Sequence, residues 1–196
     1  MSVYEDLVFR ITRVFLEHGC EAMTMSDLAK HCGMTRRGLY HHFSSKDEAF
    51  RETIRLGNER TRRESLLEGE TLIAEGASLL DVVTGILDVR YGETRRTLAA
   101  SPFAQEVNDY AFRICRPVML EAARLFQADF VRLLAGMFAA NAIALTAGMT
   151  VETLVQLLCD GARGTNQSFF APTPEGIRDR YHEMSKAILF GTVAVP

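Results

Sequence analysis

The stretch TMSDLAKHCGMTRRGLYHHFSSK, residues 24–46, contains the local signals of two short helices joined by a tight turn. Thr24 stands three residues before Asp27, which is a variant of the capping box that begins many helices. Gly33 follows where a helix ends best, because glycine tolerates a left-handed backbone. A second helix begins near Thr35. Two short helices with a glycine-containing turn between them predict a helix-turn-helix.

The second helix of this motif is rich in side chains that bond to phosphates or to base edges. Arg36 and Arg37 can each bind guanine O6 and N7 with a forked pair of hydrogen bonds, although either one could contact a phosphate instead. Helix N-termini also attract phosphate through their unpaired N–H groups. The candidate DNA-binding residues are Thr24, Thr35, Arg36, Arg37, Gly38, Tyr40, His41 and Lys46.

Gly38 has two interpretations, because a glycine inside a helix costs about 1 kcal/mol relative to alanine. It either leaves a gap where the two helices pack, or it lets the backbone approach DNA. For the motif as a whole, the alternative is a helical hairpin with a solvated basic face.

Charge supports DNA binding locally and not globally. The formal net charge of the 196-residue chain is −3. Residues 28–46, however, contain four basic side chains and no acidic one. The basic groups of a nucleic-acid-binding surface are therefore concentrated in the motif.

The rest of the chain predicts helices throughout. Apolar residues at helical spacing indicate a first helix over residues 3–18, which supplies the third wall of a small core. A fourth helix should run over residues 46–67, followed by a linker over 68–78. Later helices are expected over residues 79–91, from Ser101 and Pro102 with an interruption at Pro117, over 129–147, from the cap Thr150, and between Pro172 or Pro174 and the end.

No metal, cofactor or membrane segment is predicted. Cys20, Cys32, Cys115 and Cys159 form no CxxC pair, so we expect reduced thiols in a cytoplasmic protein. A zinc site could be drawn from residues such as His18, His31 and His41, but their spacing matches no standard finger. Residues 133–149 are slightly short for a membrane span and are better explained as a buried helix.

The N-terminal quarter resembles the DNA-binding domain of the TetR family of transcriptional repressors. The resemblance rests on Phe15, Gly19, the Thr24 cap, Leu28 with Ala29, Gly33, the Gly38-Leu39-Tyr40 triplet, Phe43, and Lys46 at the start of the next helix. It implies an all-α protein with a three-helix DNA-binding domain at residues 1–47, a connecting helix at 48–67, and a larger helical ligand-binding and dimerisation domain at 68–196. It also favours a phosphate contact by Tyr40.

The resemblance further implies a cavity for a small-molecule effector among the C-terminal helices. Apolar groups could line it while an arginine fixes a polar end of the ligand. The alternative is that these aromatic residues are simply core. The candidates are Phe103, Tyr110, Phe112, Cys115, Met119, Phe126, Phe130, Arg90, Arg113 and Arg116.

In the family, the last two long helices pair with their copies to form a homodimer. A palindromic operator needs two reading heads about 34–36 Å apart. The alternative is that both helices are buried within one subunit. The candidate interface residues are Val151, Leu154, Val155, Leu158, Ala162, Ile177, Tyr181, Met184 and Ile188.

The expected function is therefore that of a homodimeric regulator, a repressor that an unidentified small-molecule effector releases from a palindromic operator in double-stranded DNA. Activation in place of repression is left open, because it depends on where the operator lies relative to the promoter. An architectural DNA-binding protein without ligand control is the first alternative. An enzyme is the second, although residues 68–196 contain one histidine, His182, and no GxSxG, HExxH, P-loop or GxGxxG motif.

Overall fold

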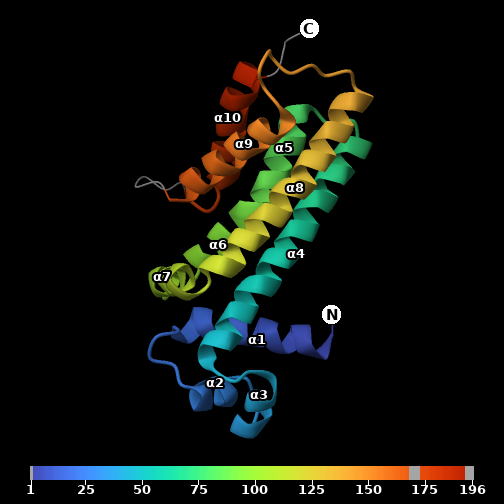
Figure 1. Cartoon of the computed structure of the whole chain (residues 1–196). Helices are drawn as coiled ribbons and strands as arrows, with labels where there is room; N and C mark the ends of the chain where they lie inside the picture. Colours follow the sequence, from blue (N-terminus) through green and yellow to red (C-terminus); the bar gives the residue numbers. More distant parts are fainter. Residues whose placement is uncertain (1, 168–172, 193–196) are drawn as a thin grey trace. The chain divides into compact units, whose positions relative to one another are not determined.

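α-Helices and one π-helical turn form the regular structure in the computed structural model, which describes residues 2–167 and 173–192 (Figure 1). No β-strand occurs within these ranges. The chain packs as two compact units, one made of Met1–Arg60 and Thr97–Ala122, the other of Thr61–Arg96 and Ala123–Pro196. The all-α prediction, with an N-terminal helix-turn-helix followed by a larger helical part, is confirmed.

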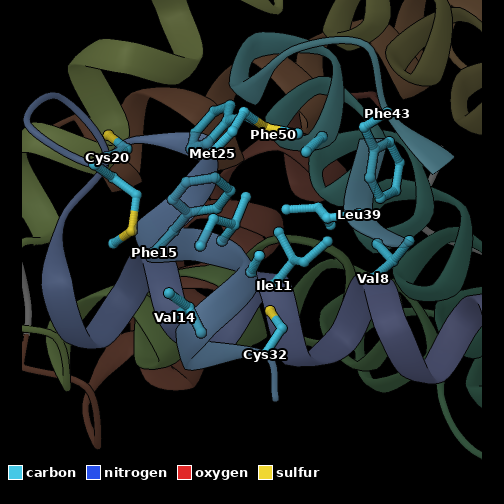
Figure 2. Packing of buried hydrophobic residues seen from close by; sticks show 14 of the residues in the cluster. Val8, Ile11, Val14, Phe15, Cys20, Met25, Cys32, Leu39, Phe43 and Phe50 are labelled. Carbon is cyan, nitrogen blue, oxygen red and sulfur yellow. The ribbon is translucent and has the colours of Figure 1, made fainter. Parts of the chain in front are cut away.

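The first unit is built from three N-terminal helices, one complete later helix and parts of others. Its elements are α1 (Val3–His18), α2 (Met25–His31), α3 (Arg36–His42), the first half of α4 (Lys46–Ala74), α7 (Ala104–Ile114) and the start of α8 (Arg116–Ala140). Their apolar faces meet in one core, part of which Figure 2 shows. Ile11, Leu28 and Leu39 are completely buried in it.

An aromatic series crosses this core from α1 to α7. The ring of Phe15 lies 5.1 Å from that of Phe50 on α4, and the ring of Phe50 lies 4.8 Å from that of Tyr110 on α7. Both pairs are edge to face, the arrangement that the ring quadrupoles favour. The series therefore joins the DNA-reading helices to a segment about 90 residues further along the chain.

The second unit has a core of its own. Its elements are the rest of α4, α5 (Leu79–Leu87), the π-helical turn η1 (Asp88–Gly92), α6 (Glu93–Ala99, whose last residues belong to the first unit), the rest of α8, α9 (Val151–Asn166) and α10 (Ile177–Thr192). Val82, Phe126, Phe130, Leu158 and Tyr181 are fully buried here.

Two helix boundaries differ from the sequence prediction. Helix α4 continues to Ala74, so the linker expected at residue 68 begins seven residues later. Gly69 does not break the helix, because it allows close packing: a Cβ atom there would lie 2.6 Å from Ile86 Cδ1. The interruption expected at Pro117 lies two residues earlier: α7 ends at Ile114, and Pro117 lies in the first turn of α8, where proline is tolerated.

Helix α8 also ends earlier than predicted. It runs over Arg116–Ala140, whereas the sequence suggested a helix over 129–147. The Ile143 N–H donates to Phe138 O at 3.0 Å, and Ala142 has a φ of 52°, so a left-handed cap closes the helix. The predicted cap Thr150 is confirmed, since its hydroxyl accepts from Thr153 N. Pro172 lies outside the described residues.

Candidate nucleic-acid interface

Helix α2 begins at the capping box that the sequence indicates. The Thr24 hydroxyl accepts a hydrogen bond from Asp27 N at 3.2 Å, and the Asp27 carboxylate accepts one from Thr24 N at 3.1 Å. Bonds from the Thr24 side chain and backbone lower the pKa of Asp27. Two of the N–H groups that a helix N-terminus leaves unpaired are therefore satisfied within the protein.

The turn between α2 and α3 has the geometry that the motif requires. Gly33 has a φ of 65°, its N–H donates to Lys30 O, and Met34 N donates to Ala29 O. These two bonds form a Schellman motif. The next helix is capped at once, because the Thr35 hydroxyl accepts from Gly38 N at 3.0 Å. The predicted helix-turn-helix is confirmed by these bonds.

Helix α3 places its predicted DNA-binding side chains on one exposed face. Leu39 faces inward and is fully buried, whereas Arg36, Arg37, Tyr40 and His41 are exposed. The guanidinium carbon of Arg36 lies 5.4 Å from the centre of the Tyr40 ring. This cation–π contact orders both side chains on the surface. The exposed face offers two guanidinium forks, a phenol and an imidazole, all of which can bond to DNA.

Gly38 is half-buried and does not lie against α2. A Cβ atom added there would meet only Thr35 Oγ1 at 3.1 Å and Met34 Cε at 3.7 Å. Both atoms belong to the turn that leads into α3. The packing-gap interpretation of this glycine is therefore wrong, and a close approach of backbone to DNA is the interpretation that stays.

Lys46 uses its ammonium group inside the protein. Its Nζ atom donates to Cys20 O at 2.5 Å and to Glu21 O at 2.8 Å, and it lies 5.5 Å from the centre of the Tyr110 ring. The side chain thus ties the start of α4 to the loop that follows α1. A phosphate contact by Lys46 stays a prediction, and its ammonium already has two carbonyl partners.

Two supporting residues of the motif were missed by the sequence reasoning. Arg10 on α1 donates from Nη1 to Cys32 O at 2.8 Å and so fixes the end of α2. Glu106 on α7 accepts hydrogen bonds from Cys20 N and Glu21 N. No local sequence pattern indicates either contact, because the bonded residues lie 22 positions apart in the first case and more than 80 in the second.

The predicted ligand residues are divided between the two units. Tyr110 and Cys115 are buried in the first core, Phe103 and Met119 pack against it, and Phe112, Arg113 and Arg116 are exposed there. Phe126, Phe130 and Arg90 are buried in the second unit. Arg113 lies 4.9 Å from the Tyr110 ring, and Arg90 lies 5.2 Å from the Phe126 ring.

An open surface pocket of the second unit is lined by other residues: Leu66, Glu70, Asp129, Arg132 and Leu133.

Arg90 is the most unusual member of this set. It lies on the π-helical turn, it is 6% exposed, and burial lowers its pKa. Its Nη1 donates to Thr61 Oγ1 at 3.0 Å. Single π turns inside helices occur often at functional sites, although here the turn also places a guanidinium beside two aromatic rings, those of Tyr91 and Phe126.

Most of the predicted dimer residues are inside the subunit. Side chains with at most 1% exposure cannot reach a partner, and this group comprises Leu154, Val155, Leu158, Ala162, Ile177 and Tyr181. The intrasubunit alternative therefore holds for these six. Val151, Met184 and Ile188 are only partly buried. On the outer sides of the same two helices, Leu157 is 41% and Phe190 67% exposed.

The described part of the chain contains neither a group of possible metal ligands nor a helix that could span a membrane. All four cysteines are free and buried. Among the described residues, no three His, Cys, Asp or Glu side chains form a group that could hold a metal ion. Within the same ranges, no helix combines the length and the apolarity needed to cross a bilayer.

This geometry defines a helix-turn-helix DNA-binding domain, and comparison with known proteins specifies its family. Residues 11–53 match the sequence model of the bacterial regulatory proteins of the tetR family. The HTH-type transcriptional regulator YfiR of Bacillus subtilis is 33% identical over 124 residues, a match that spans 62% of this chain and 58% of YfiR. The chain carries the N-terminal helix-turn-helix domain of the TetR family of transcriptional regulators.

Solved structures extend the likeness in fold to the whole chain. A transcriptional regulator from Rhodococcus sp. Rha1 superimposes with a TM-score of 0.67 at 19% identity, covering 100% of both chains. SmeT, the repressor of the SmeDEF multidrug efflux pump of Stenotrophomonas maltophilia, gives a TM-score of 0.66 at 17% identity over 99% of this chain and 92% of its own. At these identities the likeness establishes the fold alone. The family that the sequence model describes is one of bacterial regulatory proteins.

Proposed function

We propose that this protein is a homodimeric transcriptional regulator, a repressor in its simplest form, that binds a palindromic operator through the exposed face of α3. The observation that carries the proposal is the placement of Arg36, Arg37 and Tyr40 on one surface of a recognition helix that Thr35 caps at its N-terminus. Forked arginine contacts to guanine supply sequence discrimination of about 1–3 kcal/mol each. The remaining polar groups on this face supply phosphate contacts that set the register.

Dimerisation is proposed through the outer sides of α9 and α10. Leu157 and Phe190 present apolar surface there, whereas Met184 and Ile188, which are partly exposed, pack toward Gly161 between the two helices. The two helices cross closely, because a Cβ atom at Gly161 would lie 2.6 Å from Met184 Sδ. A pair of closely packed helices with an apolar outer side suits a two-fold contact with the same pair of a second copy.

Control by an effector follows from thermodynamic linkage. Some conformers of the dimer hold the two recognition helices at a spacing that does not match the operator. A ligand that binds more tightly to such a conformer lowers operator affinity by its differential affinity for the two states. Its binding site is proposed within the second unit, where Arg90 and Phe126 are in contact. A cytoplasmic location suits a protein that binds chromosomal DNA.

Selection of genomic DNA fragments by the purified protein tests this function. We expect a palindromic consensus, and we expect Arg36→Ala to weaken binding to it about 10- to 100-fold. Arg63→Ala is the matched control, because Arg63 is an exposed arginine on α4 and should leave the affinity unchanged. Binding without a consensus and with a steep salt dependence would instead indicate an architectural DNA-binding protein. A wild-type protein that selects no DNA would exclude the proposal.

Gly38→Ala separates DNA contact from helix stability. Alanine is the better helix former by about 0.5–1 kcal/mol, and the added methyl group meets only the Thr35 and Met34 side chains. We therefore expect an unchanged or slightly raised free energy of unfolding in urea, together with an operator affinity about tenfold lower. An unchanged affinity would show that the backbone at this position does not approach DNA.

A further inference from the structure

The loop between α1 and α2 is held by a carboxylate from a distant part of the chain. Glu106 Oε1 accepts hydrogen bonds from Cys20 N at 2.6 Å and from Glu21 N at 2.7 Å. Gly19 makes room for this group, since a Cβ atom there would lie 2.8 Å from the same oxygen. Two successive N–H groups that converge on one anionic oxygen form a small anion-binding nest.

The carbonyl groups of the same two residues are bound by a cation. Lys46 donates to the carbonyl oxygens of Cys20 and Glu21, so the N–H groups bind a carboxylate while the C=O groups bind an ammonium. Bonds to ionised groups are roughly twice as strong as those between neutral groups. The loop position is thus determined jointly by α7, through Glu106, and by α4, through Lys46.

Further bonds attach the segment around α7 to α1, α4 and the loop. Ser101 Oγ donates to Leu16 O at 2.6 Å near the end of α1. Arg51 Nε on α4 donates to Ile114 O at 3.1 Å, and Arg113 pairs with the side chain of Glu21 at 3.0 Å. Together with the Phe50–Tyr110 ring contact, these bonds make α7 a structural part of the DNA-reading unit.

The course of the chain gives this attachment its significance. Residues Thr97–Ala122 pack in the first unit, whereas the segments immediately before and after them, Thr61–Arg96 and Ala123–Pro196, pack in the second. Both ends of the α7 segment are therefore covalently continuous with the second unit.

We propose that Glu106 is a positioning residue for DNA recognition, which sets the α1–α2 loop and thereby the N-terminus of α2. The proposal rests on the proposed function for its DNA-binding part. The loop leads directly into the Thr24 cap, so a shift of residues 19–21 changes the angle at which α2 and α3 face DNA. Glu106 itself does not contact the DNA.

The ionisation state of Glu106 agrees with this role. Its hydrogen bonds from the backbone of Glu21 and Cys20 lower its pKa, so the group is a carboxylate at neutral pH. The neighbouring Cys20 thiol is buried, and burial raises its pKa to about 12. It therefore stays neutral and does not compete for Lys46.

Amide hydrogen exchange tests the loop contact without any DNA. In Glu106→Ala we expect the amides of Cys20 and Glu21 to exchange about tenfold faster, while the core amides of α1 keep their protection. Glu106→Gln should restore most of the protection, because its amide oxygen can still accept both bonds. Asp109→Ala is the matched control, since Asp109 is a carboxylate on the same helix whose oxygens accept hydrogen bonds from Gln105 and not from the loop. Unchanged exchange at Cys20 and Glu21 in Glu106→Ala would overturn the contact.

Affinity for the selected operator tests the positioning role. Glu106→Ala should bind about tenfold more weakly, Glu106→Gln less than threefold more weakly, and Asp109→Ala as the wild type does. The loss in the double variant Glu106→Ala/Lys46→Met should be smaller than the sum of the two single losses, because both residues bind the backbone of the same two loop residues. Faster loop exchange with unchanged operator affinity would overturn the positioning role. A wild-type protein that selects no DNA would exclude the proposed function, and the exchange experiment would still decide the loop contact.

Discussion

Phe50→Ala is expected to lower the free energy of unfolding by about 4 kcal/mol. Phe50 is 1% exposed, and its ring contacts Phe15 on one side and Tyr110 on the other. Truncation to alanine removes both edge-to-face pairs and leaves a cavity between α1, α4 and α7. Because these three helices share the core, the substitution should loosen the recognition helix as well as the helix that carries it.

Urea denaturation measures this loss, and Phe112→Ala is its control. Phe112 lies on α7 as Tyr110 does, but it is 49% exposed, so its truncation should cost less than about 1 kcal/mol. Phe50→Leu keeps most of the volume and should lie between the two. A loss below about 1.5 kcal/mol for Phe50→Ala would mean that the core between α1, α4 and α7 is not closely packed.

Gly19→Ala is expected to cost about 3 kcal/mol of folding stability, because two effects add. The residue has a φ of 78° and a ψ of 174°, a backbone conformation that is nearly exclusive to glycine and costs other residues about 1–3 kcal/mol. In addition, the new methyl group would lie 2.8 Å from Glu106 Oε1 and 2.9 Å from Phe103 Cδ1. The Glu106 carboxylate would have to move away from the loop amides.

Gly33→Ala separates the two effects. Gly33 also has a positive φ, 65°, but a Cβ atom added there would meet no atom within 4 Å beyond those of its chain neighbours. Only the backbone term applies, and we expect a loss of about 1 kcal/mol. Equal losses at the two glycines, measured by urea denaturation, would show that the contact with Glu106 contributes nothing to the requirement for glycine at position 19.

The helix-turn-helix could be predicted from the sequence because its signals are local. Thr24 and Thr35 form caps with residues three positions away, and Gly33 closes α2 through bonds to residues 29 and 30. The exposed face of α3 follows from helical period alone, since Leu39 is turned to the core. Each of these features is determined within one or two helical turns of the chain.

Features that depend on distant partners could not be predicted in this way. Gly69 belongs to a segment whose composition indicates a linker. It nevertheless lies inside α4, where the absence of a side chain lets Ile86 pack closely against it. Leu154 and Leu158 have the period of an interface, but period does not tell whether the neighbour is the same chain or a copy. The proposed effector site and the predicted division at residues 47 and 67 depend on such long-range packing, and they stay predictions.

The assignment of Thr97–Ala122 to the first unit has a consequence for protein engineering and for the exchange of domains in evolution. A chimaera cut after residue 60 would transfer the reading helices without Glu106, Tyr110 and Ser101, and it would expose the Phe50 side of the core. The transferable module is discontinuous in sequence and requires two grafts. A single-junction recombinant joins helices α1–α3 of one parent to the α7 segment of the other. It is therefore functional only where that α7 segment packs against the helix-turn-helix unit of the first parent.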